Sequence, residues 1–367
     1  MDIYADRATL AAALNHAAAV ADRKAGNPDL SAVYLSVTDR ALVVSACDTE
    51  AGVRVTMGIE GHAGEVVATS AADLTRAVRA LDGDTVRLCR DGRGRLEVSA
   101  GRSSYRLPVL AEASEQRITA RADCKVSAAG VAHLGAALGA VAHAIGTADR
   151  YGLNGIHVER EGDLLRFVAT DGHRLAVATC AADVIGDVPP KLLLPRRMAE
   201  VAAKHAAGQV CVDLGGDGTA EIAAGGVSWT FRLLEGEFPD YRAILPDSYR
   251  TRAVVARDAL VGAVKRVSIV TGRAGDAVPA RVAISAAGEV QISARTADHG
   301  EASDIISADV EGPALIVGLR PSYVLDALAM FDAAEVVLEA NEPLGPVRVS
   351  AVGGGERYAI IMPMRLS

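Results

Sequence analysis

Apolar residues recur at helical spacing in six stretches of the chain, and each stretch predicts an amphipathic helix with one buried face. The predicted helices cover residues 9–20, 70–81, 133–145, 195–206, 259–270 and 321–331. Leu10, Leu134 and Leu260 are equivalent positions in the first, third and fifth stretches, and they stand 124 and 126 residues apart. Leu74, Met198 and Val324 in the other three stretches keep the same two spacings. Two independent sets of helices therefore indicate three repeats along the chain.

Between the predicted helices the hydrophobic period changes to two, as it does in half-buried antiparallel strands. Three such segments read as hairpins, which turn at Asp39-Arg40, at Glu161-Gly162 and near Ala287-Gly288. More alternating segments follow the second helix of each repeat. The pattern predicts an α+β fold of three similar domains, each a doubled helix-plus-antiparallel-strands unit. The predicted domains are residues 1–121, 122–246 and 247–367.

Composition limits the classes of protein that the chain can belong to. It has 367 residues, 50% of them hydrophobic and 23% charged, which suits two or three packed domains. No apolar run approaches the ~18 residues of a membrane span, and the start "MDIYADRATL" does not resemble a secretory signal. We therefore expect a cytoplasmic protein without a membrane role. A net charge of −8, taken alone, argues against a nucleic-acid partner.

Motifs for catalysis or cofactor binding are missing from the sequence. The five cysteines are far apart, which argues against a disulfide framework or a zinc site, and no phosphate-binding loop or dinucleotide fingerprint occurs. We expect no cofactor and no metal. Asp171 and His173 in "TDGHRL" could be a catalytic pair, although Asp-Gly is a turn former. An α+β hydrolase that uses Asp171 and His173, and a repeat-built scaffold that binds only proteins, are the competing hypotheses.

Three stretches of the chain carry a family resemblance. They are "YGLNGIHVEREGDLLRFVATDGHRLAV", "LEGEFPDYRAILP" and the tail "YAIIMPMRL". On a threefold repeat of this size, they resemble the bacterial sliding clamp, the β subunit of DNA polymerase III. The resemblance implies a head-to-tail homodimer, a ring of six domains through which duplex DNA threads. It also implies a non-catalytic processivity factor, located in the cytoplasm at the nucleoid.

The resemblance implies a hydrophobic cleft between the second and third domains. There the DNA polymerase III catalytic subunit, the clamp loader, other polymerases and repair proteins insert a short peptide with Gln, Leu and Phe. The residues of this chain that line the cleft would be Arg150, Leu153, Thr170, Gly172, His173, Arg174, Leu175, Pro239, Ile244, Ile360, Met362, Pro363, Met364, Arg365 and Leu366. Methionines suit a groove that repacks around different partners. Alternatively, Ile360 and Met362 complete an edge strand and fill the core.

Duplex DNA needs cations facing its phosphates, and the predicted helices carry several exposed Lys and Arg residues. We predict that Lys24 and Tyr151 in loops, and Arg197 and Lys265 on helices, face the phosphates. The alternative for the cations on the helices is that they form solvated helix faces. A protein that is acidic overall can still present a positive surface to DNA if its charges are segregated.

The resemblance also implies where the two copies of the chain join. Tyr105 and Leu107, in the strand "SSYRLPVL" of the first domain, would pack against Ile269 and Val270 of the partner's third domain. An unpaired strand edge favours such pairing.

The chain departs from the family pattern at several places. After "FPDYR", where many members carry a second Arg, it has Ala243, so one polar contact to the peptide is expected to be missing. The stretches "LPVLAEASEQRI" and "DRKAGNPDL" in the first domain are also unusual. A specialised paralogous clamp for repair is therefore an alternative to the main replicative clamp.

Overall fold

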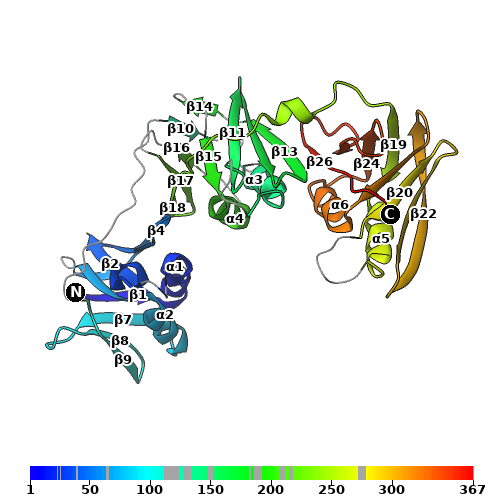
Figure 1. The fold of residues 1–367 in the computed structure, drawn as a ribbon. Helices are drawn as coiled ribbons and strands as arrows, with labels where there is room; N and C mark the ends of the chain where they lie inside the picture. Colours follow the sequence, from blue (N-terminus) through cyan, green and yellow to red (C-terminus); the bar gives the residue numbers. More distant parts are fainter. Residues whose placement is uncertain are drawn as a thin grey trace. The chain divides into compact units, whose positions relative to one another are not determined.

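The computed structural model divides the chain into two compact units, each of which is described by itself (Figure 1). The first consists of Met1–Val131, Asp183–Pro189 and Gly208–Leu233, and the second of Ala132–Ala182, Pro190–Ala207 and Leu234–Ser367. The residues that the structure describes are 1–22, 24, 26–38, 40–62, 66–110, 124–127, 134–147, 152–181, 183–185, 192–205, 211–214, 218–271 and 278–366.

The first unit contains helices α1 (Arg7–Val20) and α2 (Ala71–Ala80), a short 3-10 helix η1 (Pro28–Ser31) and two antiparallel sheets. One sheet has the order β5-β1-β7-β8-β9 and the other β14-β10-β16-β17-β18-β4-β3-β2-β6. The strands are β1 (Asp2–Asp6), β2 (Ala32–Thr38), β3 (Ala41–Cys47), β4 (Ala51–Gly58), β5 (Glu60–His62), β6 (Val66–Ser70), β7 (Thr85–Arg90), β8 (Leu96–Ala100), β9 (Ser103–Leu107), β10 (Cys124–Ser127), β14 (Asp183–Ile185), β16 (Cys211–Leu214), β17 (Thr219–Ala224) and β18 (Val227–Arg232).

The second unit contains helices α3 (Leu134–Ala142), α4 (Arg196–His205), α5 (Arg257–Ser268) and α6 (Pro321–Leu328), with the 3-10 helix η3 (Tyr241–Ile244). Its antiparallel sheet has the order β15-β11-β12-β13-β26-β25-β24-β19-β22-β21-β20-β23. The strands are β11 (Gly155–Glu161), β12 (Leu164–Thr170), β13 (Arg174–Ala181), β15 (Leu192–Pro195), β19 (Thr251–Ala256), β20 (Ala280–Ser285), β21 (Glu289–Thr296), β22 (Gly300–Glu311), β23 (Leu315–Leu319), β24 (Glu335–Ala340), β25 (Val347–Ala351) and β26 (Tyr358–Ile361).

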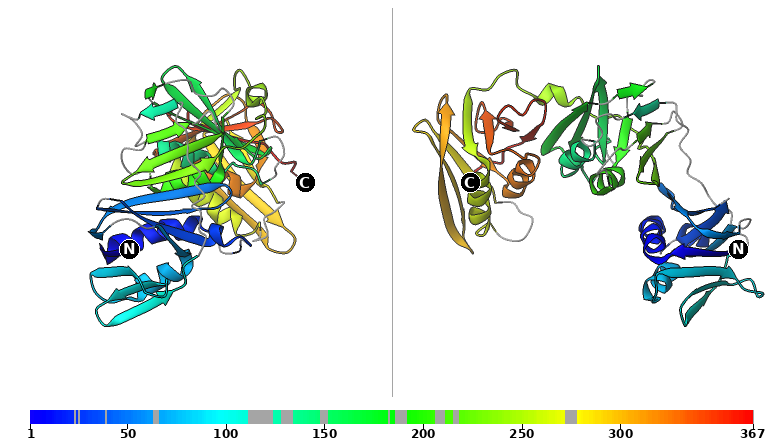
Figure 2. Two further views of the ribbon diagram at one scale, coloured as in Figure 1. Left: turned by 90° about the vertical axis from the view of Figure 1, so that its left-hand side faces the viewer. Right: turned by 180° about the vertical axis from the view of Figure 1, so that it is seen from behind.

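The helices begin and pack as the sequence requires. The Asp6 carboxylate accepts a hydrogen bond from the Thr9 N–H (2.8 Å) and so caps α1, and the Ser70 hydroxyl caps α2 in the same way. The helices pack in pairs, α1 with α2, α3 with α4 and α5 with α6, and α5 covers strands β19–β22 (Figures 1 and 2). Leu10, Leu134 and Leu260 are all buried, as their equivalent positions predict. None of the described helices is long and apolar enough to cross a membrane.

The α+β fold and the six helices predicted from the sequence are confirmed, and so are the three hairpins. The second hairpin turns one residue later than predicted, because Glu161 is still the last residue of β11, and Gly162 adopts a positive φ of 59°. Asp39, in the first turn, lies outside the described residues. The two boundaries between the three predicted domains stay predictions.

The C-terminal strand β26 lies inside a sheet, so the alternative interpretation of Ile360 and Met362 was wrong about an edge strand, although Ile360 does fill the core. β26 pairs with β25 on one side and with β13 on the other, where Ile360 lies opposite Leu175. Ile360 is fully buried in a cluster with Val168, Leu175, Val177 and Tyr241. The tail is therefore held by both of its neighbours up to Ile361, which positions the residues after it.

Candidate functional site

The segment "TDGHRL" forms a tight turn between β12 and β13. The Asp171 carboxylate accepts hydrogen bonds from the backbone N–H groups of His173 (2.9 Å) and Arg174 (3.0 Å), and Gly172 has a φ of 86° that favours glycine. The side chain of Arg174 donates a third bond to the same carboxylate (3.0 Å). Asp171 therefore stabilises the turn, and His173 is exposed. This geometry gives no support to the hypothesis of a hydrolase that uses the two residues.

Arg174 links this turn to α6. Its guanidinium donates to the Asp326 carboxylate (2.5 Å) and lies 4.3 Å from the centre of the Tyr323 ring. Arg320 contacts the same ring at 4.8 Å and donates to the Tyr323 hydroxyl (3.1 Å). Nearby, burial and then the charge of Arg174 lower the pKa of His143, which favours its neutral form. A half-buried patch of two arginines and one aromatic ring therefore lies where β13 meets α6.

The C-terminal tail runs past this patch. The Met362 N–H donates to the His173 carbonyl (2.9 Å), and Pro363, which has no N–H, ends the pairing with β13. The Met364 N–H then donates to the carbonyl of Gly318 in β23 (2.8 Å). A Cβ at Gly318 would lie 2.9 Å from Leu366 Cδ2, so a glycine is needed for the tail to approach β23 this closely. The backbone of the tail is fixed, while Met362, Pro363 and Met364 stay half-buried and Leu366 is 41% exposed.

We define this surface by His173, Arg174, Arg320, Tyr323, Met362 and Met364, and call it the tail groove after the cleft predicted from the sequence. Leu175 and Ile360 lie beneath it in the core. Pro239 and Ile244 lie in the segment 238–245, whose Phe238, Tyr241 and Leu245 pack on this core cluster, and Leu153 lies in a separate segment before β11. The carbonyl of Leu153 accepts a bond from the Gly146 N–H (2.7 Å), Pro239 is exposed, and Ile244 is 48% exposed. Arg150 and Tyr151 lie outside the described residues.

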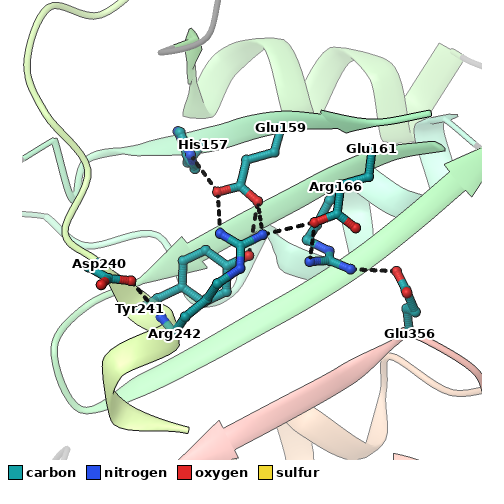
Figure 3. A network of polar contacts seen from close by, with 8 residues as sticks. All are labelled: His157, Glu159, Glu161, Arg166, Asp240, Tyr241, Arg242 and Glu356. Atoms are coloured by element: carbon teal, nitrogen blue, oxygen red, sulfur yellow. Dashed lines mark hydrogen bonds and ion pairs between the residues drawn. The ribbon is translucent and has the colours of Figure 1, made fainter. Parts of the chain in front are cut away.

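A second polar cluster joins β11, β12, η3 and the hairpin before β26 (Figure 3). Arg242, from "FPDYR", donates to both oxygens of Glu159 (2.8 and 2.6 Å) and to Glu161 (3.0 Å). Arg166 donates to Glu161 (2.8 Å) and to Glu356 (2.7 Å). We call the cluster the charge brace, and its members are His157, Glu159, Glu161, Arg166, Tyr241, Arg242 and Glu356.

Glu159 is the centre of the charge brace. Besides Arg242, it accepts a hydrogen bond from the Tyr241 hydroxyl (3.1 Å), and the His157 Nε2 lies 3.1 Å away. Burial acts to raise the pKa of Glu159, but the hydrogen bonds from Arg242 and Tyr241 outweigh burial and hold the pKa below its ordinary value of 4.5. Burial also raises the pKa of Tyr241. No sequence pattern indicates this cluster, because its members come from three separate stretches of the chain, 157–166, 241–242 and 356.

The residues predicted to face DNA have different surroundings. Lys24 and Lys265 are exposed, and Arg197 is half-buried on α4. Several other helix cations are already engaged within the protein. Arg79 donates to Asn15 (2.6 Å), Arg196 to the Ile145 carbonyl (2.7 Å) and Arg266 to Asp304 (2.5 Å).

β9 and β22 are two of the strands that have an edge without a partner among the described residues. β9 pairs only with β8, and its Tyr105 is 40% exposed while Leu107 is half-buried. β22 pairs with β21 over residues 300–307 and with β19 over residues 308–311, so its first part has no partner on its other edge among the described residues. Ile305 on that half is 56% exposed, and Ile269 at the end of α5 is 77% exposed. Val270 is half-buried, and the sequence reasoning missed Ile305.

Metal ligands do not gather anywhere in the described part of the chain, where no group of His, Cys, Asp and Glu residues is placed to hold an ion. Cys47, Cys89 and Cys180 form no disulfide there. Burial raises the pKa of Cys180 to about 11, which disfavours its reactive thiolate form.

Comparison with known proteins defines the class of the molecule as a DNA-clamp protein. Residues 1–116, 131–240 and 242–365 match the models of the N-terminal, central and C-terminal domains of the DNA polymerase III beta subunit. The chain belongs to this family, the bacterial beta sliding clamps.

Relatives and solved structures match over the full length. The chain is 28% identical to the beta sliding clamp of Pseudomonas putida and 29% identical to that of Caulobacter vibrioides, with all of both chains covered in each case. A Pseudomonas aeruginosa clamp bound to griselimycin is similar at 27% identity and a TM-score of 0.92, again over all of both chains. A Caulobacter crescentus clamp with polyethylene glycol at its beta-motif tethering region has 25% identity and a TM-score of 0.90, and covers 100% of this chain and 99% of that one. These findings confirm the predicted family and fold class.

Proposed function

We propose that two copies of this chain form a closed ring that encircles duplex DNA, slides along it and holds polymerases on the template. The observation that carries the proposal is the threefold repeat, in which three helix pairs with their strands are matched by three successive clamp-domain models. Two chains supply six such domains, and steps of about 60° each would close a ring. Topology, and not tight binding, would then keep the protein on DNA.

The free strand edges support the head-to-tail joint. The edge of β9, with Tyr105 and Leu107, pairs in the proposal with the first half of β22 from the partner. Ile269 and Val270 contribute apolar contacts there, and we add the exposed Ile305 to them. Pairing satisfies backbone groups that an open edge leaves to water, and it removes a site of aggregation.

The tail groove is the proposed docking site for partner peptides with Gln, Leu and Phe. The partners are the DNA polymerase III catalytic subunit, the clamp loader, other polymerases and repair proteins. Its half-buried methionines support this role because flexible thioether side chains repack around different apolar anchors. A similar clamp binds griselimycin, and another has a ligand at its beta-motif tethering region, which supports a ligand site in this family.

Contact with DNA is proposed to be weak, and independent of sequence. Lys24, Tyr151, Arg197 and Lys265 would face phosphates, and phosphate contacts carry no sequence information. The protein would have no catalytic activity of its own and would act in the cytoplasm, at the nucleoid.

Primer extension on a primed circular template tests this function. The assay contains the replicative polymerase and clamp loader of the same organism, with or without the protein. We expect long products only when the protein is present, and short products with a variant that ends at Pro363. Products of the same length with and without the protein would overturn the proposal.

A further inference from the structure

A hollow of about 530 Å³ lies on strands β20–β22, on the face of the sheet that is turned away from α5. Val282, Ile284 and Ile292 are buried on the face that α5 covers. Side chains alternate along a strand, so Arg281 on β20 and Ser293 on β21 point to the opposite face, where they line the hollow. Its volume is within the range of ordinary ligand pockets, ~300–1,000 Å³. We call it the sheet pocket, and none of the six residues that define the tail groove lines it.

The strand register brings three polar side chains into one row across the floor of the sheet pocket. Arg281 lies opposite Ser293, and Ser293 lies opposite Ser303 on β22. Residues that are directly opposite on neighbouring strands have Cβ atoms about 4.5–5.5 Å apart and point to the same face. Gln291, two residues before Ser293, donates a hydrogen bond to the Ser303 hydroxyl (3.0 Å) and holds that end of the row.

Arg281 and Ser293 have donors that no other group in the described part of the chain uses. Both side chains are half-buried, and neither makes a hydrogen bond or an ion pair there. A guanidinium cannot lose its charge, so its partial removal from water is unfavourable unless an acceptor replaces the water. The row therefore holds two adjacent donors that suit the oxygen atoms of an anion.

The other lining residues narrow the kind of anion. Two arginines and one glutamate line the sheet pocket, which gives it one net positive charge in a chain whose net charge is −8. Arg295 and Glu301 lie 4.0 Å apart at the open rim, where they are 85% and 77% exposed, so Arg281 supplies the charge that is left over. The walls are apolar and consist of Val278, Pro279 and Leu366. Free phosphate does not suit such walls, because it would lose hydration there without gaining apolar contacts.

We propose that the sheet pocket binds an acidic residue of a partner protein, at a place where that residue has an apolar neighbour. The carboxylate accepts hydrogen bonds from the Arg281 guanidinium and the Ser293 hydroxyl, and partial burial strengthens these charged hydrogen bonds. The apolar neighbour packs against the walls. The inference goes beyond the proposed function, because the sheet pocket is a second site whose ligand leaves the tail groove free.

Matched short peptides test the proposal in saturation-transfer NMR, which detects weak ligands, with the full-length protein. The probes are acetyl-Leu-Glu-Leu amide and its neutral counterpart acetyl-Leu-Gln-Leu amide. We expect the Glu peptide to bind about tenfold more tightly than the Gln peptide, as one charged hydrogen bond predicts. The preference should shrink as salt is added.

Three variants assign the preference to Arg281. Arg281→Gln should abolish the preference for Glu over Gln and leave the affinity for the Gln peptide unchanged, while Arg281→Lys should keep part of the preference. Arg252→Gln is the matched control, because it removes an equal charge from β19, where Arg252 lies 3.7 Å from Glu311. This control should leave the preference intact.

Competition separates the sheet pocket from the tail groove. A saturating amount of the Gln-Leu-x-Leu-Phe peptide should leave binding of the Glu peptide unchanged, and inorganic phosphate at the same concentration as the Glu peptide should not displace it. Equal binding of the two short peptides, a preference that survives Arg281→Gln, or displacement by either competitor would overturn the proposal. Failure of the Gln-Leu-x-Leu-Phe peptide to bind anywhere would overturn only the proposed role of the tail groove, provided that the short Glu peptide keeps its preference.

Discussion

The charge brace and the tail groove lie at the two ends of strand β26, and they use arginine in opposite ways. Before the strand, Glu356 is bound to Arg166, which belongs to a network centred on Glu159 and Glu161 (Figure 3). After the strand, Met362 and Met364 are fixed by their backbones alone, and Arg320 has no carboxylate partner among the described residues. Each carboxylate of the brace is paired with an arginine of the same unit, so we expect the brace to contribute to stability. The groove leaves apolar and cationic groups half-exposed, so we expect it to contribute to binding.

Truncation after Pro363 should have the largest effect and should affect only the groove. It removes Met364 and Leu366, and buried anchors at the centre of an interface commonly contribute ~2 kcal/mol or more each. Peptide affinity should therefore fall about 30-fold or more in calorimetry, while the dimer mass is kept in ultracentrifugation. If the folded truncation binds the peptide as well as the full chain does, the tail belongs to the core. The contrast between a stabilising charge brace and a binding tail groove would then be wrong.

Glu159→Gln should lower the stability of the protein and leave peptide binding almost unchanged. It removes the acceptor charge that Arg242, Tyr241 and His157 share, and hydrogen bonds to charged groups contribute about 1.5–3 kcal/mol. We expect the free energy of unfolding to fall by about 2 kcal/mol and peptide affinity to stay within about threefold. The single tryptophan, Trp229, lies in the first unit, so circular dichroism is the suitable probe. Glu335→Gln, at the exposed start of β24, is the control and should change neither quantity.

The pH dependence of stability should identify Glu159 more specifically. Its pKa is lowered in the folded state, so its contribution is complete above the ordinary value of 4.5 and is lost as the pH falls through the lower folded value. The stability difference between the native protein and Glu159→Gln should be constant near neutral pH and should shrink below pH 4.5. A difference that persists unchanged in acid would assign the effect of the variant to packing instead of charge.

Ala243→Arg should have the smallest effect. Ala243 is exposed in η3 beside Arg242, and a new surface cation contributes at most about 1 kcal/mol. We expect peptide affinity to rise by no more than about fivefold, and Ala243→Gln to leave it unchanged. Weaker binding of the Arg variant would show that the expected polar contact is not made at this position.

The parts of the molecule that could be predicted from the sequence are those that local patterns encode. Helical spacing around Leu10, Leu134 and Leu260 was enough to find the repeat, since each residue is buried by the period of its own helix. The Asp-Gly turn at 171–172 was equally local. The tail "YAIIMPMRL" was identified through the family resemblance, and its methionines indicated a surface that adapts to different partners.

The charge brace and the role of β26 could not be predicted in this way. Arg166 and Glu356 are 190 residues apart, and polar side chains at alternate positions of a strand look the same whether they meet water or one another. The register that places Ile360 opposite Leu175 depends on how one domain meets the next, which no local period encodes. Arg320 reads as an ordinary residue before a helix until the partners of Arg174 are known.

Retention on DNA after a high-salt wash tests the central claim most directly. The protein is loaded on nicked circular DNA by its matching loader and washed at a salt concentration where the dimer survives. A ring should stay on the circle, because its apolar joints are little weakened by salt, whereas a protein held by phosphate contacts alone loses ~10³ or more in affinity. Cutting the circle should release it, and Ile269→Asp with Val270→Asp, which buries charges in the joint, should prevent retention. Release from intact circles, or retention on the linear form with free ends, would contradict the account.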